Sequence, residues 1–163
     1  MSLKILRVRF DAADGTLLLD LGDSAVISKR YINKIRKLGF DLKPELHVTI
    51  LGFRQGRLLV ELIQQDTSFA RQIMELADKV KWSVYPSGLR YILQKEKDNI
   101  LKQSIVEIVH LKGGADFITG LNTLTGASFY EQVPHVTLAT KGDPGGIGIY
   151  SQEDLSLYAI DAP

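Results

Sequence analysis

Apolar and polar residues alternate over a short stretch near the start of the chain. Residues 6–10 read Leu-Arg-Val-Arg-Phe, and this period of two is typical of a half-buried strand. Asp14-Gly15 is a tight-turn signal, after which residues 16–21 are expected to return as a second strand. The pattern therefore predicts a β-hairpin over residues 6–21.

Residues 24–38 have the period of a helix instead. Ile27, Tyr31 and Ile35 fall on one face, and Gly39 follows the last turn, where a C-terminal cap is expected. Helical spacing recurs in three later stretches, residues 58–63, 69–80 and 115–124. The sequence thus predicts four helices.

Runs of β-branched and aliphatic residues predict the remaining strands. They cover residues 45–53, 82–85, 89–94, 104–111, 133–139 and 155–160. Two of these strands, 82–85 and 89–94, are expected to meet at a Pro86-Ser87-Gly88 turn, and residues 142–148 are read as a glycine-rich loop. Because no linker or low-complexity stretch interrupts the 163 residues, we expect a single domain over residues 1–163, built from one or two lobes.

One arrangement of these elements occurs twice. A strand, a helix and a strand that carries His-Val-Thr are predicted over residues 16–21, 24–38 and His47, and again over residues 104–111, 115–124 and His135. This order is typical of a diverged internal duplication, whose halves would form two similar lobes that face each other.

The charge of the chain is balanced. Twenty basic and nineteen acidic residues give a formal charge of +1, which argues against a broad basic face for long nucleic acids. A local pocket for one phosphate or one RNA end remains compatible with this balance. We therefore expect affinity to come from a few contacts at the phosphate, with little gain from a longer RNA.

The composition also restricts the chemistry and the compartment. The absence of cysteine excludes disulfides, thiolate zinc sites and a cysteine nucleophile. Residues 1–10 carry three basic side chains and do not resemble a signal peptide, and no apolar run approaches the roughly 18 residues that a membrane span needs. We expect a soluble cytoplasmic protein that does not contact a membrane.

The candidate chemistry lies in two matching segments, His47-Val48-Thr49 and His135-Val136-Thr137. Residues i and i+2 of a strand point to the same side, so each histidine shares a face with its threonine, while the apolar residues around them face a core. Two of the three histidines are followed by threonine in this way, which favours a functional pair over two structural histidines. His110 has no such partner and is interpreted as structural.

These paired segments resemble the two-histidine (2H) phosphoesterases, also called the LigT-like family, which two His-x-Thr or His-x-Ser strands define. The resemblance covers nearly the whole chain in layout. It implies an α+β fold with two pseudo-symmetric lobes, antiparallel-rich sheets that line a central cleft, and helices outside. It also implies cleavage of cyclic or 2′,5′ phosphodiesters in nucleotides or at an RNA 3′ end, without a metal or cofactor.

The chemistry of the side chains agrees with this resemblance. Opening a cyclic phosphate needs a base on one side of phosphorus and an acid on the other, and histidine can serve as either near neutral pH. His47 and His135 are the predicted catalytic pair, and the hydroxyls of Thr49 and Thr137 would donate to the phosphate oxygens. The sequence leaves open which histidine is the base.

Three further residues are candidates for accessory contacts. Arg54 and Lys141 follow the two threonines closely and could place positive charge near the phosphate, although a solvated surface role is equally compatible with the sequence. Tyr130 could stack on a base, with packing at the rim as the alternative.

Several other functions remain as alternatives. A 2′,5′-phosphodiesterase that acts on oligonucleotides is the nearest, followed by an RNA 2′,5′-ligase that runs the reverse reaction. A non-catalytic module that binds a nucleotide or an RNA end belongs to a different class. A metal site is disfavoured because His-x-Thr is not a ligand spacing and no HExxH pattern surrounds either histidine. We expect a monomer.

Overall fold

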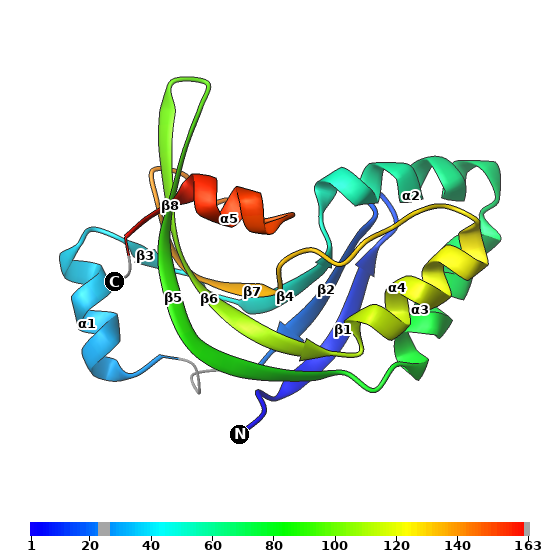
Figure 1. Ribbon diagram of the computed structural model, residues 1–163, viewed down its shortest axis with the longest axis horizontal. Coiled ribbons are helices and arrows are strands. Elements are labelled where there is room, and N and C mark those ends of the chain that lie inside the picture. The colour runs from blue at the N-terminus through cyan, green and yellow to red at the C-terminus, as the bar shows by residue number, and fades with distance from the viewer. Residues whose placement is uncertain (23–26, 162–163) are drawn as a thin grey trace.

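The computed structural model describes residues 1–22 and 27–161. Within these residues the chain forms five helices and one eight-stranded sheet in which all pairings are antiparallel, so the expected α+β class is confirmed (Figure 1). The strands are β1 (Ile5–Asp11), β2 (Thr16–Leu21), β3 (Asp41–Leu42), β4 (Leu46–Leu51), β5 (Ser83–Lys97), β6 (Ile100–Lys112), β7 (His135–Lys141) and β8 (Ala159–Asp161). The helices are α1 (Lys29–Lys37), α2 (Phe53–Gln65), α3 (Ser68–Lys79), α4 (Gly114–Thr125) and α5 (Gln152–Tyr158).

The two strands that carry the His-x-Thr segments lie at the centre of the sheet. The strand order is β1-β2-β4-β7-β6-β5-β8, and β3 also pairs with β7. β4 and β7 are in register only at Val48 and Val136, so they meet over a short contact. Helices α2, α3 and α4 lie at one end of the molecule and α1 at the other, with the sheet between them (Figure 1).

Strand alternation divides the apolar residues between two cores. Val48 and Val136, the central residues of the two segments, are fully buried in the larger core, which α1, α2, α3 and α4 share. The smaller core lies on the other side of β6 and β7 and consists of Leu93, Val106, Val133, Ile147 and Ile149. The histidines and threonines therefore occupy the face that the larger core does not use.

The first hairpin forms as the sequence predicts. β1 and β2 pair around Asp14 and Gly15, and Gly15 has a φ of +74°, which favours glycine. A Cβ at this position would overlap the backbone of Gly56, so the missing side chain also lets the hairpin turn pack directly on α2. Both requirements explain why glycine occupies this turn.

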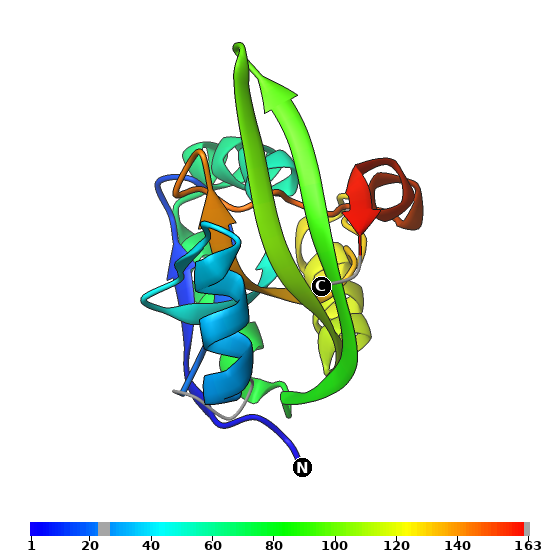
Figure 2. The ribbon, with the colours of Figure 1, turned by 90° about the vertical axis from the view of Figure 1, so that its left-hand side faces the viewer.

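The predicted turn at Pro86-Ser87-Gly88 is wrong. Residues 82–85 and 89–94 do not form two strands, because Ser83 to Lys97 are one strand, β5, which curves along β6 (Figure 2). The register with β6 shifts between Pro86 and Arg90, and the Ser87 hydroxyl donates to the carbonyl of Ile108. The proline and glycine thus produce a bulge that bends a continuous strand.

The last predicted strand, residues 155–160, is also largely wrong. Residues 152–158 form α5, which begins where the Ser151 hydroxyl accepts a hydrogen bond from the amide of Asp154. Only residues 159–161 are extended and pair with β5. The capping serine therefore determines the start of a helix that the apolar pattern does not reveal.

Two predicted boundaries also change. Ser28 caps α1, so the helix begins at Lys29 and not at residue 24; residues 24–26 lie outside the described residues. The strand predicted over residues 45–53 ends at Leu51, because Gly52 caps α2 and Phe53 is already helical. None of the helices in the described residues is long and apolar enough to cross a membrane.

Candidate active site

The two His-x-Thr segments lie side by side on one face of the sheet. Val48 pairs with Val136 in an antiparallel register. Extending this register by one residue in each direction places His47 beside Thr137 and Thr49 beside His135. The four side chains then occupy the corners of a quadrilateral, with the two histidines at opposite corners.

All four of these side chains line one cavity of about 260 Å³. The other lining residues come from β2, from the segments before β4 and β7, from the start of α2 and from the loop after β7: Thr16, Leu18, Lys43, Gly52, Phe53, Gln132, Gly146, Ile147, Gly148 and Tyr150. The cavity therefore brings together the four residues that the sequence predicts as catalytic and phosphate-binding.

His135 is held in a fixed orientation. Its side chain is buried, and Nδ1 lies 2.8 Å from the carbonyl oxygen of Val133. A carbonyl can only accept, so the neutral ring carries its proton on Nδ1 and leaves Nε2 as an unprotonated nitrogen. Burial lowers the pKa of His135 below its ordinary value, and the nearby His47 acts in the same direction, although the bond to Val133 opposes them.

His47 has a more polar environment. Burial lowers its pKa and the positive charge of Arg9 adds to this effect, while the carboxylate of Asp20 acts in the opposite direction. Nδ1 of His47 is buried and has no hydrogen-bond partner among the described residues. A bare acceptor nitrogen costs less to bury here than an N–H without an acceptor, so the neutral ring is expected to carry its proton on Nε2.

Asp20 and two arginines form an ion cluster beside His47. Asp20 is the cross-strand partner of His47 in the β2–β4 pairing. Its carboxylate accepts hydrogen bonds from Arg7 Nε at 2.6 Å and from Arg9 Nη2 at 2.9 Å. Burial raises the pKa of Asp20, but the hydrogen bonds from the two arginines outweigh this effect and hold the pKa below its ordinary value.

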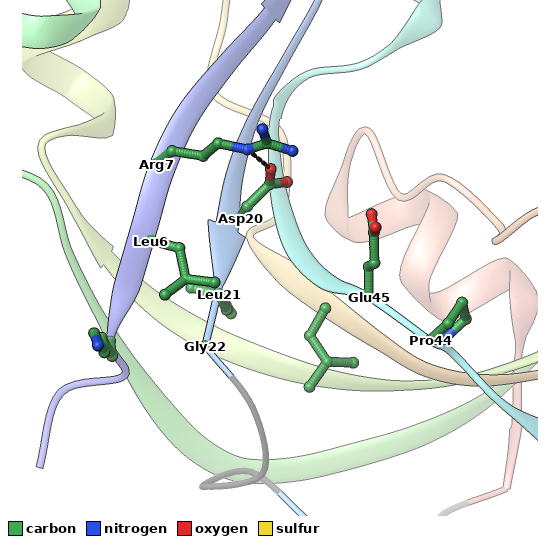
Figure 3. Close-up of a pocket in the computed structure, with 9 residues that line it drawn as sticks. Leu6, Arg7, Asp20, Leu21, Gly22, Pro44 and Glu45 are labelled. Carbon is green, nitrogen blue, oxygen red and sulfur yellow. Dashed lines mark hydrogen bonds and ion pairs between the residues drawn. The ribbon is translucent and has the colours of Figure 1, made fainter.

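The cluster also borders a second hollow. Figure 3 shows this pocket of about 530 Å³, with Arg7 joined to Asp20 above the side chains of Leu6 and Leu21. Glu45 extends toward the same space from the segment before β4. Positive and negative side chains are mixed here, which keeps the net charge next to His47 small.

Two buried glutamines connect the strand that carries His47 to the segment before His135. Gln132 accepts from the amide of Gly52 at 3.2 Å and donates to the carbonyl of Thr49 at 3.1 Å. Gln55, in α2, donates to the carbonyl of Tyr130 at 3.0 Å and accepts from its amide at 2.9 Å. The two hydrogen bonds of Gln132 join this segment directly to the end of β4 and supplement the short β4–β7 pairing. Those of Gln55 join the segment to α2 instead.

The three predicted accessory residues lie outside the lining of the cavity. The guanidinium of Arg54 stacks on the ring of Tyr150, 4.3 Å from its centroid, so it lies behind a lining residue. Lys141 donates through Nζ to the carbonyl of Leu38, 3.0 Å away at the end of α1. Tyr130 has a half-exposed side chain, while Gln55 binds its backbone.

Three residues that sequence reasoning did not select also line the cavity. Lys43 is one of them. The sequence could have indicated it, because every second residue of an extended segment points to the same side, and residues 43, 45, 47 and 49 form such a series. Gln132 and Tyr150 are the others, and no local pattern marks them. A Cβ on Gly146 would lie 3.0 Å from the Thr137 hydroxyl, so the loop backbone packs closely over that side chain.

The described residues contain no group of three or more histidine, cysteine or acidic side chains that could hold a metal ion. His110, which the sequence marks as structural, is exposed on β6 and does not line the cavity. Comparison of the chain with protein-family models, curated proteins and solved structures finds no match. A function for the cavity therefore has to be argued from its own geometry.

Proposed function

We propose that this protein is a metal-independent phosphoesterase of the two-histidine type that opens 2′,3′-cyclic phosphates of nucleotides or RNA ends. One observation carries the proposal: two His-x-Thr segments from different strands line a single cavity. The antiparallel pairing of Val48 with Val136 implies that their histidines lie diagonally across it. This arrangement suits an in-line displacement at phosphorus, in which the attacking and leaving oxygens lie on opposite sides.

The strand order supports a duplicated architecture for such an enzyme. β2, α1 and β4 occur in this order in the first half of the chain, with the two-residue β3 before β4, and β6, α4 and β7 occur in the same order in the second half. In the sheet, the order β1-β2-β4 is continued by β7-β6-β5, which is the reverse order of the corresponding strands. Two pseudo-symmetric lobes related by a twofold axis near Val48 and Val136 would have this order.

The tautomers suggest different roles for the two histidines. Nε2 of neutral His135 has a free lone pair and would take a proton from the attacking water, while its Nδ1–H stays on the Val133 carbonyl. The water oxygen then bonds to phosphorus and the bond to one ribose oxygen breaks. His47, in its imidazolium form, would give its Nε2 proton to that leaving oxygen and be left with its proton on Nδ1. Loss of the acquired proton from His135 to solvent and uptake of a proton from solvent at Nε2 of His47 then restore the starting forms of both rings.

The lowered pKa values of both histidines are compatible with this scheme. Both rings favour the neutral form, because burial disfavours a charge on each of them, Arg9 further disfavours a charge on His47, and His47 further disfavours a charge on His135. An anionic phosphate between them would stabilise an imidazolium and so raise the pKa of the acid. Lys43 would add positive charge, while Thr49 and Thr137 would donate to the oxygens on which charge accumulates.

A kinetic comparison of histidine variants tests the proposal. We expect the wild-type chain to open a 2′,3′-cyclic mononucleotide in the presence of a strong chelator. His47→Ala and His135→Ala should each lower kcat by about 10²- to 10⁴-fold, and the double variant should be little worse, because both groups act in one step. His110→Ala is the matched control and should retain full activity. Near-normal turnover by His47→Ala would refute the two-histidine mechanism.

Two further experiments, with different substrates and with a chelator, distinguish the proposed function from the alternative functions. Matched cyclic-phosphate, 2′,5′-linked and 3′,5′-deoxy substrates should be compared by kcat/KM, and the deoxy substrate should be inert if the 2′ oxygen is essential. A preference for the 2′,5′ linkage would favour the oligonucleotide phosphodiesterase. Loss of activity in the chelator with rescue by a divalent metal would favour a metallohydrolase, and tight binding without turnover would favour a binding module.

A further inference from the structure

Helix α1 concentrates positive charge that the composition of the whole chain conceals. Five of its nine residues are basic, Lys29, Arg30, Lys34, Arg36 and Lys37, and none is acidic. All five are exposed, and none forms an ion pair with another described residue. A quarter of the 20 basic residues of the chain therefore lie on one short helix without local compensation.

Three of these side chains line a groove beside the helix. Arg30, Lys34 and Lys37 occupy positions i, i+4 and i+7 and therefore share one side of α1, where they border a hollow of about 650 Å³. Arg90 of β5 lines the other side, and it is held in place by the buried Glu107 at 2.7 Å. No acidic residue of the described chain lines this groove.

The groove is connected to the candidate active site by two more lysines. The ammonium of Lys141 contacts the carbonyl of Leu38, the residue after Lys37. Lys141 and Lys43 line a common hollow of about 330 Å³, and Lys43 also lines the catalytic cavity. We call Lys43, Lys141, Lys37, Lys34 and Arg30 the basic track.

Acidic residues interrupt this track at few points. Two described acidic residues, Asp143 and the exposed Asp41, line the hollow that Lys43 and Lys141 share. Asp143 is already paired with Lys102, at 2.9 Å. Positive charge therefore predominates from the cavity to the far end of α1.

We propose that the basic track binds the phosphates of a single RNA strand whose 3′ end occupies the catalytic cavity. The proposal rests on the proposed function and specifies its substrate as an oligonucleotide end, not a free mononucleotide. Along α1 the three cations are separated by about 6 and 4.5 Å, from a rise of 1.5 Å per residue, so they could contact successive phosphates. The proposal differs from the expectation from net charge, which is that a longer RNA adds little to affinity.

Two features favour an RNA strand over a membrane surface. An amphipathic helix that binds a bilayer needs an exposed apolar face, but Ile35 of α1 is fully buried in the larger core, with Tyr31 packed against that core. The track also leads into the cavity. On the other side of the cavity the smaller core, with Ile147 and Ile149, covers the sheet, so a strand would leave toward α1.

A length comparison with neutralised lysines tests the proposal. The dissociation constant of a 12-nucleotide RNA with a 3′-phosphate end is measured for the wild type and for Lys34→Gln/Lys37→Gln. The dissociation constant of a dinucleotide with the same end is measured for both proteins as well. The matched control is Lys79→Gln/Lys81→Gln, which removes two exposed lysines at the end of α3 and just after it. Both double variants remove two charges near the end of a helix.

The expected result has a defined size. The binding constant falls with about the 0.7th power of the salt concentration for each neutralised phosphate. Each phosphate contact therefore raises the affinity about fivefold at 0.1 M salt relative to 1 M. The wild type and the control should bind the 12-mer much more tightly than the dinucleotide. Lys34→Gln/Lys37→Gln should lose about 25-fold in affinity for the 12-mer, and its salt slope should fall by about 1.4. Its kcat and KM for a 2′,3′-cyclic mononucleotide should not change.

Other results would overturn the proposal. Equal affinity for the 12-mer and the dinucleotide, or equal losses in the two double variants, would show that the track does not bind RNA. Binding to phosphatidylserine vesicles that requires Lys34 and Lys37, with unchanged RNA binding, would assign the helix to a membrane. If the wild type opens no cyclic phosphate, the proposed function fails; a 12-mer loss confined to Lys34→Gln/Lys37→Gln would still support the RNA track.

Discussion

Gln132 provides the sharpest test of how the two His-x-Thr strands are held together. Its side chain is only 6% exposed, and both of its polar atoms bind the backbone of the β4–α2 junction, at Gly52 and Thr49. Replacing it by methionine keeps the side-chain volume approximately and removes both hydrogen bonds. We expect Thr49 to lose its defined position relative to His135, since β4 and β7 share only one registered pair.

The effect on stability follows from these contacts. A hydrogen bond contributes about 0.5–1.5 kcal/mol net, and a buried N–H left without an acceptor costs about 1–3 kcal/mol. Gln132→Met should therefore lower the free energy of unfolding by about 2–4 kcal/mol. A displacement of about 1 Å at the reacting groups can cost up to 100-fold in rate, so kcat for a 2′,3′-cyclic mononucleotide should fall by about 10- to 100-fold.

Gln55→Met is the matched control, because Gln55 also binds one backbone segment with two hydrogen bonds but does not line the cavity. Urea unfolding should give similar losses of stability for the two variants, while steady-state kinetics should show a large fall in kcat only for Gln132→Met. Equal values of kcat in the two variants would refute the positioning role of Gln132 and leave it a purely structural residue.

Three further predictions concern the chemistry of the cavity. Thr49→Ala and Thr137→Ala should each raise the activation free energy of phosphate-ring opening by at most about 2–4 kcal/mol, measured as a lower kcat. Unchanged kcat in both variants would make these threonines structural. Asp20→Asn removes the carboxylate that raises the pKa of His47, so the basic limb of the kcat profile should move to lower pH. The histidines of the unfolded chain take up protons below about pH 6.5, whereas both native rings have lowered pKa values. The free energy of unfolding, measured in urea, should therefore fall as the pH falls below this value. The fall should be smaller in His135→Gln.

The sequence predicts those parts of the site that depend on local periodicity. Alternation places His47 and Thr49 on one face of β4, and His135 and Thr137 on one face of β7, each opposite a buried valine, Val48 or Val136. That the two faces line one cavity is a result of tertiary structure.

Local signals fail where one residue type serves two geometries. Pro86 and Gly88 are typical of a turn, but proline and glycine also occur in bulges, and the long partner strand β6 determines which geometry forms. Ser151 as a helix cap and Gln132 as a bridge to Gly52 involve single residues with no periodic pattern. The place of Lys141 in the sequence is compatible with either a phosphate contact or a surface role, and its contact with Leu38 depends on the position of α1.

The two matching segments are not equivalent in their surroundings, and this difference determines how the proposed chemistry divides between them. His135 is buried and is bound to the Val133 carbonyl, and among the described residues no acidic side chain shifts its pKa. His47 faces Asp20 and Glu45 as well as Arg9, so a carboxylate is available to stabilise its imidazolium. Identical residues in nearly identical strands can thus act as base and acid, because the environment of each ring, and not the motif, decides which protonation state is favoured.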